Sequence, residues 1–358
     1  MLWRLPASVR SLSFSAPRGT LRAYSADATM RCSSANPLRI LFCGSDNFSV
    51  ASLRALDNAK REVSGLIHSV DVVHRPAKHT GRGLKTLKEV PVAHVATEEL
   101  KLATHVIDTF TGWTPPVPID LIIAVSFGLF VPPRILSLAK YGGINVHPSL
   151  LPDLRGPAPI EHAILKRRER TGVSVQTLHP EHFDQGTILA QAPAPGIQIN
   201  RNTIIAALQD QLAQAGAQML VDVLKHKKYI SPHEDVGWYA NSSEPIDHAP
   251  KITKQDRFVD FDTKTMDDIQ AMHLALGDLW LILPNGQRLV IHKTNDIQKR
   301  DAVRREHNIW KDEGFPTPFF RAACGRIGMI VSSTYAGQRA GQGNRKAMQV
   351  LFKQDRTW

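Results

Sequence analysis

Two side chains that can carry chemistry stand two residues apart at the end of an apolar run, Asn145 and His147 in Gly-Ile-Asn-Val-His. Side chains alternate along a strand, so this spacing puts both on one side of a sheet, about 7 Å apart. Pro148 ends the strand. An amide donates hydrogen bonds without titrating, and an imidazolium donates them with a charge, so the pair can stabilise a developing oxyanion. The spacing indicates acyl or formyl transfer.

Such a reaction also needs a group that takes a proton from an attacking amine. Asp184 lies in Phe-Asp-Gln-Gly, a loop before an expected strand, where Gly186 permits a tight turn. Spacing alone does not put Asp184 beside His147. The same residues also fit a capping Asn145, a surface His147 and a turn Asp184, and the distance between Asp184 and His147 separates the two interpretations.

The elements that position these residues are predicted to form a Rossmann-like α/β domain. Residues 38–43 form an apolar strand, and after a Gly-Ser-Asp turn the apolar spacing of Phe48, Leu53 and Leu56 predicts a helix. Further strands are expected at residues 63–68, 91–95, 120–126 and 172–178. The alternation indicates a mostly parallel sheet. Because no glycine occurs between Gly44 and Gly65, the GxGxxG fingerprint of dinucleotide sites is absent.

The rest of the chain is predicted to hold one exposed loop, a long helix and a second domain. Residues 71–90 are rich in His, Pro, Gly and Lys and read as a long surface loop. Apolar periodicity from Ile204 to Val223 predicts a long helix with Asn202 as its N-cap. This helix closes the first domain, which is expected to span residues 37–230. Residues 231–250 read as a linker. Residues 251–358 combine a helix at 265–276 with short strands and an Asn285-Gly286 hairpin turn, which predicts a small OB-like β-barrel.

Composition bounds the classes that remain. Residues 1–24 hold four arginines, several serines and no acid, which is typical of a mitochondrial transit peptide and predicts a matrix location. Without this leader the net charge falls from +11 to +7, a surplus that favours a polyanionic partner. The apolar runs are too short for a membrane span. Three scattered cysteines predict neither a disulfide framework nor a zinc cage, and Cys43 is expected in the core.

Three motifs resemble those of the folate-dependent formyltransferases. They are INVHPSLLPDLRGPAPIEHAI, FDQGTIL about forty residues further on, and VSFGLFVPPRIL just ahead. RPAKHTGRG, APKITKQDRFVDF and GQGNRKAM are similar to segments of the branch of that family that formylates methionine on initiator tRNA. The likeness spans Leu38 to Met348.

The resemblance implies a reaction and its residues. The formyl donor would be 10-formyltetrahydrofolate, the acceptor the α-amino group of initiator methionyl-tRNA, and no metal would be required. Asn145, His147 and Asp184 take the catalytic positions. The residues expected to contact folate are Phe127, Gly128, Leu129, Ser149, Leu150, Leu151 and Pro152. The basic residues expected to contact tRNA phosphates are Arg82, Lys85, Lys225, Lys227, Lys228, Arg345 and Lys346, with the three lysines from 225 at the junction of the domains.

Two alternatives stay open. One is a formyltransferase that acts on a small amine, against which the basic C-terminal domain argues. The other is a non-catalytic protein that binds tRNA or folate. Asp153 and His74 depart from the family pattern, which bears on tRNA contacts rather than on formyl chemistry. We expect a monomer.

Overall fold

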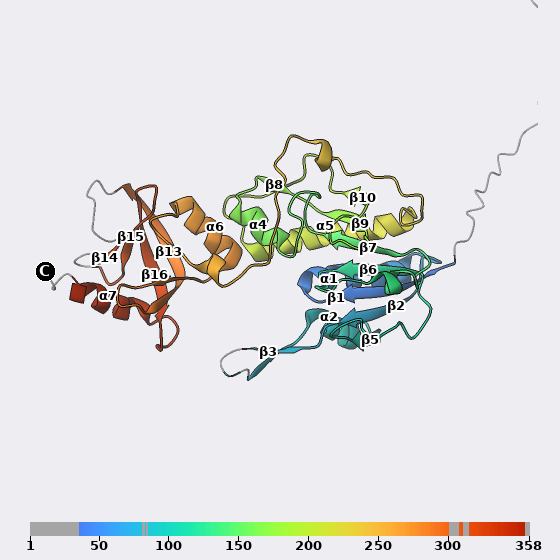
Figure 1. The fold of residues 1–358 in the computed structure, drawn as a ribbon, viewed down its shortest axis with the longest axis horizontal. Coiled ribbons are helices and arrows are strands. Elements are labelled where there is room, and N and C mark those ends of the chain that lie inside the picture. Colours follow the sequence, from blue (N-terminus) through green and yellow to red (C-terminus); the bar gives the residue numbers. More distant parts are fainter. Residues whose placement is uncertain (1–35, 81–82, 84, 301–307, 311–314, 355–358) are drawn as a thin grey trace, which may run out of the picture. The chain divides into compact units, whose positions relative to one another are not determined.

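A seven-stranded β-sheet organises the first part of the chain, in the order β10-β9-β7-β6-β1-β2-β5 (Figure 1). The computed structural model describes residues 36–80, 83, 85–300, 308–310 and 315–354, so the predicted leader lies outside the described residues. The strands are β1 (Leu38–Gly44), β2 (Ile67–His74), β5 (Ala103–Val106), β6 (Leu121–Val125), β7 (Gly143–His147), β9 (Ser174–Thr177) and β10 (Ile188–Gln191). β9 is antiparallel to β7 and β10, and the other pairs are parallel, which confirms the predicted mostly parallel sheet.

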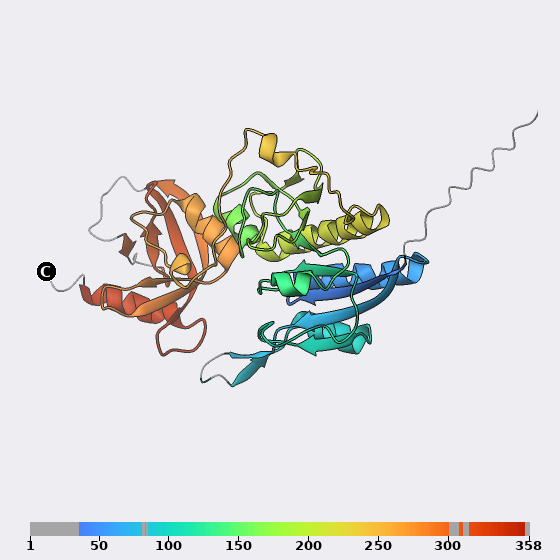
Figure 2. The same cartoon turned by 45° about the vertical axis from the view of Figure 1, so that its right-hand side comes forward.

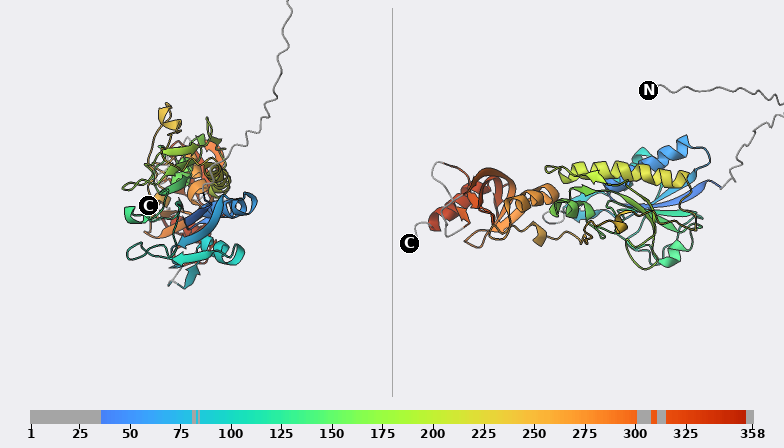
Figure 3. Two further views of the ribbon diagram at one scale, coloured as in Figure 1. Left: turned by 90° about the vertical axis from the view of Figure 1, so that its right-hand side faces the viewer. Right: turned by 90° about the horizontal axis from the view of Figure 1, so that it is seen from above.

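Alternating side chains of β1 face two hydrophobic layers. Ile40 and Phe42 belong to a layer with α1 (Asn47–Glu62) and α5 (Ile205–Lys225), which lie on the same face of the sheet (Figure 3). Leu41 and Cys43 belong to the layer that includes Ile135 of α3 (Pro133–Leu136). Cys43 is fully buried, as predicted for a core residue, and burial raises the pKa of its thiol. With both faces covered, the strand ends remain as the place for a site.

Two strand predictions in this sheet were wrong. The strand expected at 63–68 begins only at Ile67, because residues 63–66 include a turn in which Gly65 has a φ of 76°. The strand expected at 91–95 is α2 (Pro91–His94), followed by a π-helical turn (Val95–Glu99). The N–H groups in the first turn of a helix have no partner within the helix, so a proline, which has no N–H, fits there without loss. Pro91 therefore starts a helix where the apolar content indicated a strand.

The segment predicted as a long loop contains a hairpin instead. β2 continues to His74, and β3 (Lys78–Thr80) pairs antiparallel with β4 (Thr86–Lys88). The hairpin projects from the sheet (Figure 2). It follows the carboxyl end of β2, so it leaves the sheet at the edge where the carboxyl ends of the parallel strands meet.

The long amphipathic helix was predicted correctly but its cap was not. α5 begins at Ile205, and Ile204 precedes it without a side-chain cap. The side-chain oxygen Oδ1 of Asn202 instead accepts a 3.0 Å hydrogen bond from Gln270 Nε2 in the next domain. The shorter elements beside α5 are α4 (Pro159–Leu165), β8 (Arg170–Thr171) and β11 (Ile197–Gln198).

A small antiparallel β domain follows, which confirms the predicted fold class. It contains α6 (Met266–Leu276), the sheet β12-β13-β16-β15-β14, and α7 (Gly343–Gln354). The strands are β12 (Leu279–Ile282), β13 (Arg288–Arg300), β14 (Ile309–Trp310), β15 (Phe319–Arg321) and β16 (Arg326–Tyr335). β12 and β13 form the predicted hairpin, and irregular pairing between Ile291 and Thr294 adds the local bend typical of a bulge.

Contacts between α4 and α6 join the two parts. Arg167, just after α4, pairs with Asp268 at 3.4 Å and with Asp267 at 3.9 Å. Ala275 and Leu276 of α6 belong to the large hydrophobic cluster that includes α1 and α5. In the part of the chain that is described, no helix has the length and apolarity to cross a bilayer.

Candidate active site

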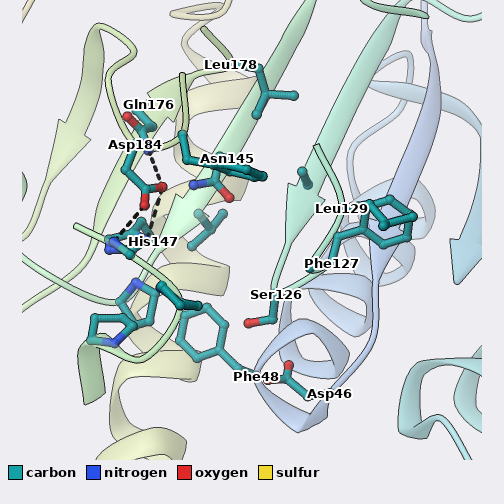
Figure 4. A pocket seen from close by; sticks show the side chains of 18 of the residues that line it. Asp46, Phe48, Ser126, Phe127, Leu129, Asn145, His147, Gln176, Leu178 and Asp184 are labelled. Atoms are coloured by element: carbon teal, nitrogen blue, oxygen red, sulfur yellow. Dashed lines mark hydrogen bonds and ion pairs between the residues drawn. The ribbon is translucent and has the colours of Figure 1, made fainter. Parts of the chain in front are cut away.

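A cavity of about 580 Å³ lies at the carboxyl ends of β1, β6 and β7 (Figure 4). Strand β1 lies between β2 and β6. The chain therefore adds strands on one side of β1 first and then on its other side, and the cavity lies at this switch in strand order. Open α/β sheets bind ligands at such a switch. The cavity has a polar and an apolar part. The polar side chains that line it are those of Asp46, Ser126, Asn145, His147, Gln176 and Asp184. The apolar side chains that line it are those of Phe48, Phe127, Leu129, Val131, Ile160 and Leu178.

His147 and Asp184 come together, although they lie in different segments. The distance from His147 Nδ1 to Asp184 Oδ1 is 3.5 Å, and both side chains are at most one-tenth exposed. His147 Nε2 donates to the Leu154 carbonyl at 3.1 Å. A carbonyl only accepts, so this bond fixes a hydrogen on Nε2 and leaves Nδ1 as the ring nitrogen that faces Asp184.

Three further groups hold the Asp184 loop. The Gly156 N–H donates to Asp184 Oδ2 at 2.9 Å, and Gln176 Nε2 donates to Oδ1 at 3.3 Å. Arg155 Nε donates to the Asp184 backbone carbonyl at 2.9 Å. Asp184 has a φ of 55°, a left-handed conformation that is unusual for a residue with a side chain. The hydrogen bonds hold the carboxylate in this conformation and aim it at His147.

Gly186 permits a close approach that no other residue allows. A Cβ at this position would lie 1.7 Å from the Thr177 carbonyl oxygen. Its N–H donates to Gln176 Oε1 at 3.0 Å, so Gln176 links both ends of the Asp184 turn.

Asn145 lies on the same strand as His147, and its amide borders the cavity (Figure 4). The side chain is half-buried, and no described residue is hydrogen bonded to its amide. Its two amide hydrogens are therefore available to a bound ligand. One unpaired donor now stands beside a carboxylate–imidazole pair, which is the constellation that stabilisation of an oxyanion and removal of a proton require.

The residues predicted to contact folate divide into two sets. Phe127, Gly128 and Leu129 line the cavity. Ser149 to Pro152 do not, because this turn lies behind the catalytic strand. Ser149 is fully buried and donates to the Asp153 carbonyl at 2.6 Å, while Gln191 donates to the Leu151 carbonyl at 2.8 Å.

The predicted tRNA contacts lie on several surfaces. Lys85 is exposed next to β4, Arg345 and Lys346 are exposed on α7, and Arg82 lies outside the described residues. Lys225 ends α5, and Lys227 and Lys228 follow it.

Lys225, Lys227 and Lys228, at the carboxyl end of α5, are not at the junction of the domains, where they were expected. The ring of the next residue, Tyr229, lies 5.1 Å from that of Tyr141, just before β7. That position is at the amino ends of the parallel strands, opposite the cavity. The junction is formed by α4 and the other end of α5, where Asn202 contacts Gln270.

Asp153, which departs from the family pattern, is buried against Arg168. It is 5% exposed, and Arg168 donates to its carboxylate at 3.1 Å.

Sequence reasoning missed Gln176 and Asp46. Gln176 belongs to strand β9 and pairs with Asn145 across the β7–β9 ladder, so its place in the site depends on a pairing that no local pattern shows. Asp46 caps α1 by accepting from the Ser49 N–H at 3.0 Å, and burial raises the pKa of its carboxyl. Its position after the first strand was the available signal. In the described residues, no cluster of His, Cys, Asp and Glu fits a metal ion.

Comparison with known sequences identifies a family and named relatives. Residues 38–224 match the formyl transferase family. The mitochondrial methionyl-tRNA formyltransferase of Saccharomyces cerevisiae is 34% identical over 258 residues, which cover 62% of this chain and 63% of that protein. The Ehrlichia canis methionyl-tRNA formyltransferase is 34% identical, over 72% of this chain and 80% of that protein. The mouse mitochondrial protein is 31% identical, over 68% of this chain and 58% of its own length.

Solved structures share the fold at low sequence identity. An N-formyltransferase from Helicobacter canadensis, in complex with folinic acid and dTDP-3-aminofucose, has a TM-score of 0.54 at 14% identity, over 82% of this chain and 98% of that one. HypX from Aquifex aeolicus, in complex with tetrahydrofolic acid, has a TM-score of 0.50 at 15% identity, over 85% of this chain and 45% of that one.

Proposed function

The chain belongs to the formyl transferase family, and we propose that it transfers a formyl group from 10-formyltetrahydrofolate to the α-amino group of methionine on initiator tRNA. The observation that carries the proposal is the convergence of Asn145, His147 and Asp184 on one cavity, with His147 Nδ1 3.5 Å from Asp184 Oδ1. Relatives named methionyl-tRNA formyltransferase, at 31% to 34% identity, support the acceptor.

The cavity suits a folate donor. Phe127, Leu129 and Val131 offer apolar walls for a flat ring, and the chain around Gly128, which has a φ of 75°, runs along the cavity. When bound, the donor supplies an activated formyl group. Folate ligands in the Helicobacter canadensis and Aquifex aeolicus structures support this choice.

Each catalytic residue has a distinct task. The Asn145 amide donates to the formyl oxygen, on which negative charge grows as the amine attacks. An α-amine has an ordinary pKa of about 7.7–8.0, so a useful fraction is neutral and nucleophilic near neutral pH. Asp184, 3.5 Å from His147 Nδ1, orients the imidazole ring at the edge of the cavity, beside the place of that oxygen. Asp184 also receives the proton that the amine nitrogen loses when its bond to carbon forms. The tetrahedral intermediate then collapses: the bond between the formyl carbon and the N10 nitrogen of the donor breaks, that nitrogen takes a proton, and tetrahydrofolate leaves.

The leader and the relatives support a location. The Arg-rich residues 1–24 and the mitochondrial names of the yeast and mouse proteins favour mitochondria, and we place the enzyme in the matrix, as a monomer that serves translation initiation. Processing would remove the leader near residue 24.

One assay tests the reaction and its acceptor. Purified protein is incubated with 10-formyltetrahydrofolate and with methionyl initiator tRNA, methionyl elongator tRNA, glycinamide ribonucleotide or an amino sugar nucleotide. N-Formylmethionine on initiator tRNA is expected. Formylation of only a small amine would replace the proposed acceptor, and binding of tRNA without product from any acceptor would favour a non-catalytic protein.

A further inference from the structure

Residues 245–250, which we call the strap, run beside residues 154–158 next to the candidate site. The Leu154 N–H donates to the Asp247 carbonyl at 2.7 Å, and the Ala249 N–H donates to the Arg155 carbonyl at 2.8 Å. Arg155 and His248 form a parallel bridge. The predicted linker is thus bound to the segment that follows the catalytic strand.

The other side of the same segment holds the catalytic pair. The Leu154 carbonyl accepts from His147, and the Gly156 N–H donates to Asp184. Within residues 154–156, two backbone groups bond to the strap and two others bond to His147 and Asp184. A shift of this segment therefore moves both the acceptor of the His147 hydrogen bond and the donor to Asp184.

A cluster of charged side chains, Asp153, Lys166, Arg168 and Asp247, holds the strap in place. Arg168 Nη2 donates to Asp153 Oδ1 at 3.1 Å and to Asp247 Oδ2 at 2.7 Å. Asp153 Oδ1 also accepts from the Asp247 N–H at 2.8 Å, and Lys166 pairs with Asp247 at 3.2 Å. The side chains of Asp153 and Arg168 are 7% and 14% exposed, so solvent weakens their interaction little.

Packing makes this contact stiff. Leu154 has a φ of 56° and packs with Ala163 and Ala249. Gly156 has a φ of +124°, and a Cβ there would lie 2.4 Å from the Ala249 carbonyl oxygen. Leu154 and Gly156 are therefore held in conformations that depend on the strap.

We propose that Asp153, Arg168 and Asp247 are positioning residues for formyl transfer, which orient His147 and Asp184 by holding the strap against residues 154–156. This inference rests on the proposed function. The three residues do not line the cavity. They act on the geometry of the His147–Asp184 pair, for which a displacement of about 1 Å can cost up to a hundredfold in rate.

The test compares Arg168→Met with Arg170→Met in the full-length protein. Arg170 is an exposed neighbour outside the cluster, so its variant controls for loss of one positive charge. Arg168→Met is expected to lower kcat by about tenfold or more, with the KM for folate and for tRNA within about twofold of wild type. Arg168→Lys, which keeps the charge but loses the guanidinium whose Nη2 reaches both carboxylates, is expected to give a kcat between those of Arg168→Met and wild type.

In the kinetic comparison, the inference is overturned by a wild-type kcat in folded Arg168→Met, by a raised KM at unchanged kcat, or by a lower melting temperature with no change in kcat. If Arg168→Met does not fold, Asp247→Asn, at a half-exposed position, decides by the same criteria.

A readout without turnover separates this inference from the proposed function. Wild-type protein that formylates no acceptor contradicts the function. Amide hydrogen exchange of residues 154–158 still tests the strap, because it is expected to be faster in Arg168→Met than in Arg170→Met. Equal exchange in both variants overturns the positioning role.

Discussion

At the residue scale, the site needs one unpaired amide and one carboxylate–imidazole pair. Asn145→Ala, His147→Ala and Asp184→Ala are each expected to lower kcat by about two to three orders of magnitude, the usual loss for a group that stabilises a developing charge. The rate of N-formylmethionine formation measures this, and filter binding measures tRNA affinity, which is expected to stay nearly unchanged. Asn58→Ala, at an exposed position on α1, serves as control. Wild-type turnover in all three variants would refute the mechanism.

The Asp184 turn gives a second prediction at this scale. Gly186→Ala places a Cβ 1.7 Å from the Thr177 carbonyl oxygen, whereas Gly65, with a φ of +76°, has nothing within 4 Å of its Cβ position. Gly186→Ala is expected to lower the free energy of unfolding by about 3 kcal/mol, because the backbone must move. Gly65→Ala is expected to cost about 1 kcal/mol from its φ alone. Urea titration of both variants measures the difference, and equal losses would contradict the steric argument.

Residue types and spacing predicted part of the candidate site. Alternation along a strand correctly put Asn145 and His147 on one side, since that follows from local geometry. The nearness of Asp184 depends on how β9 pairs with β7, and Gln176 was missed for the same reason. Ser149 to Pro152 were assigned to folate by resemblance, and none of these four residues lines the cavity. Local pattern does not tell a residue in the cavity from one that holds its wall.

At the element scale, the sequence predicts long periodic elements and fails for short ones. α5 and β1 carry enough apolar residues to show their period. Residues 91–95 carry too few apolar residues to show a period, and Pro91 at their start favours a helix. The β3–β4 hairpin lacks an apolar face, which is why its pattern resembled a loop. Side chains that fix elements to each other, such as Arg39 and Asp120, give no local signal either.

Arg39 and Asp120 connect β1 to the start of β6. Arg39 Nε donates to Asp120 Oδ2 at 2.9 Å, and this hydrogen bond holds the pKa of the carboxyl below its ordinary value of 3.8. A carboxyl with a lowered folded-state pKa stabilises the fold above its ordinary pKa and loses that contribution as pH falls through the lowered value.

Arg39→Met is therefore expected to lower the melting temperature by a few degrees at pH 7. The difference from wild type should shrink as pH falls below the ordinary value of 3.8. Calorimetry over a pH series measures this. Arg54→Met, which breaks an exposed pair with Glu99, controls for loss of a surface charge. A difference that is the same at every pH would contradict the argument.

At the scale of the whole molecule, the carboxyl ends and the amino ends of the parallel strands differ in their distance from the cavity, and so in their access to a large substrate. Under the proposed function, the methionine end of a tRNA enters the cavity at the carboxyl ends of the strands. Lys85 belongs to the hairpin at these carboxyl ends, whereas Lys225 ends α5 and Lys228 follows it at the opposite, amino ends of the strands. Sequence reasoning grouped them by charge alone, because the direction of α5 across the sheet is a tertiary property.

This difference predicts how salt acts on tRNA binding. Each phosphate contact adds to the slope of log affinity against log salt concentration, since it releases a counterion. Lys85→Gln is expected to reduce that slope by about 1 and to weaken binding at low salt. Lys101→Gln, at an exposed position after the π-helical turn, serves as control. Fluorescence anisotropy at several salt concentrations measures the slopes. A slope that Lys85→Gln leaves unchanged removes the hairpin from the interface, and a slope reduced by Lys225→Gln with Lys228→Gln means that tRNA also reaches the opposite edge.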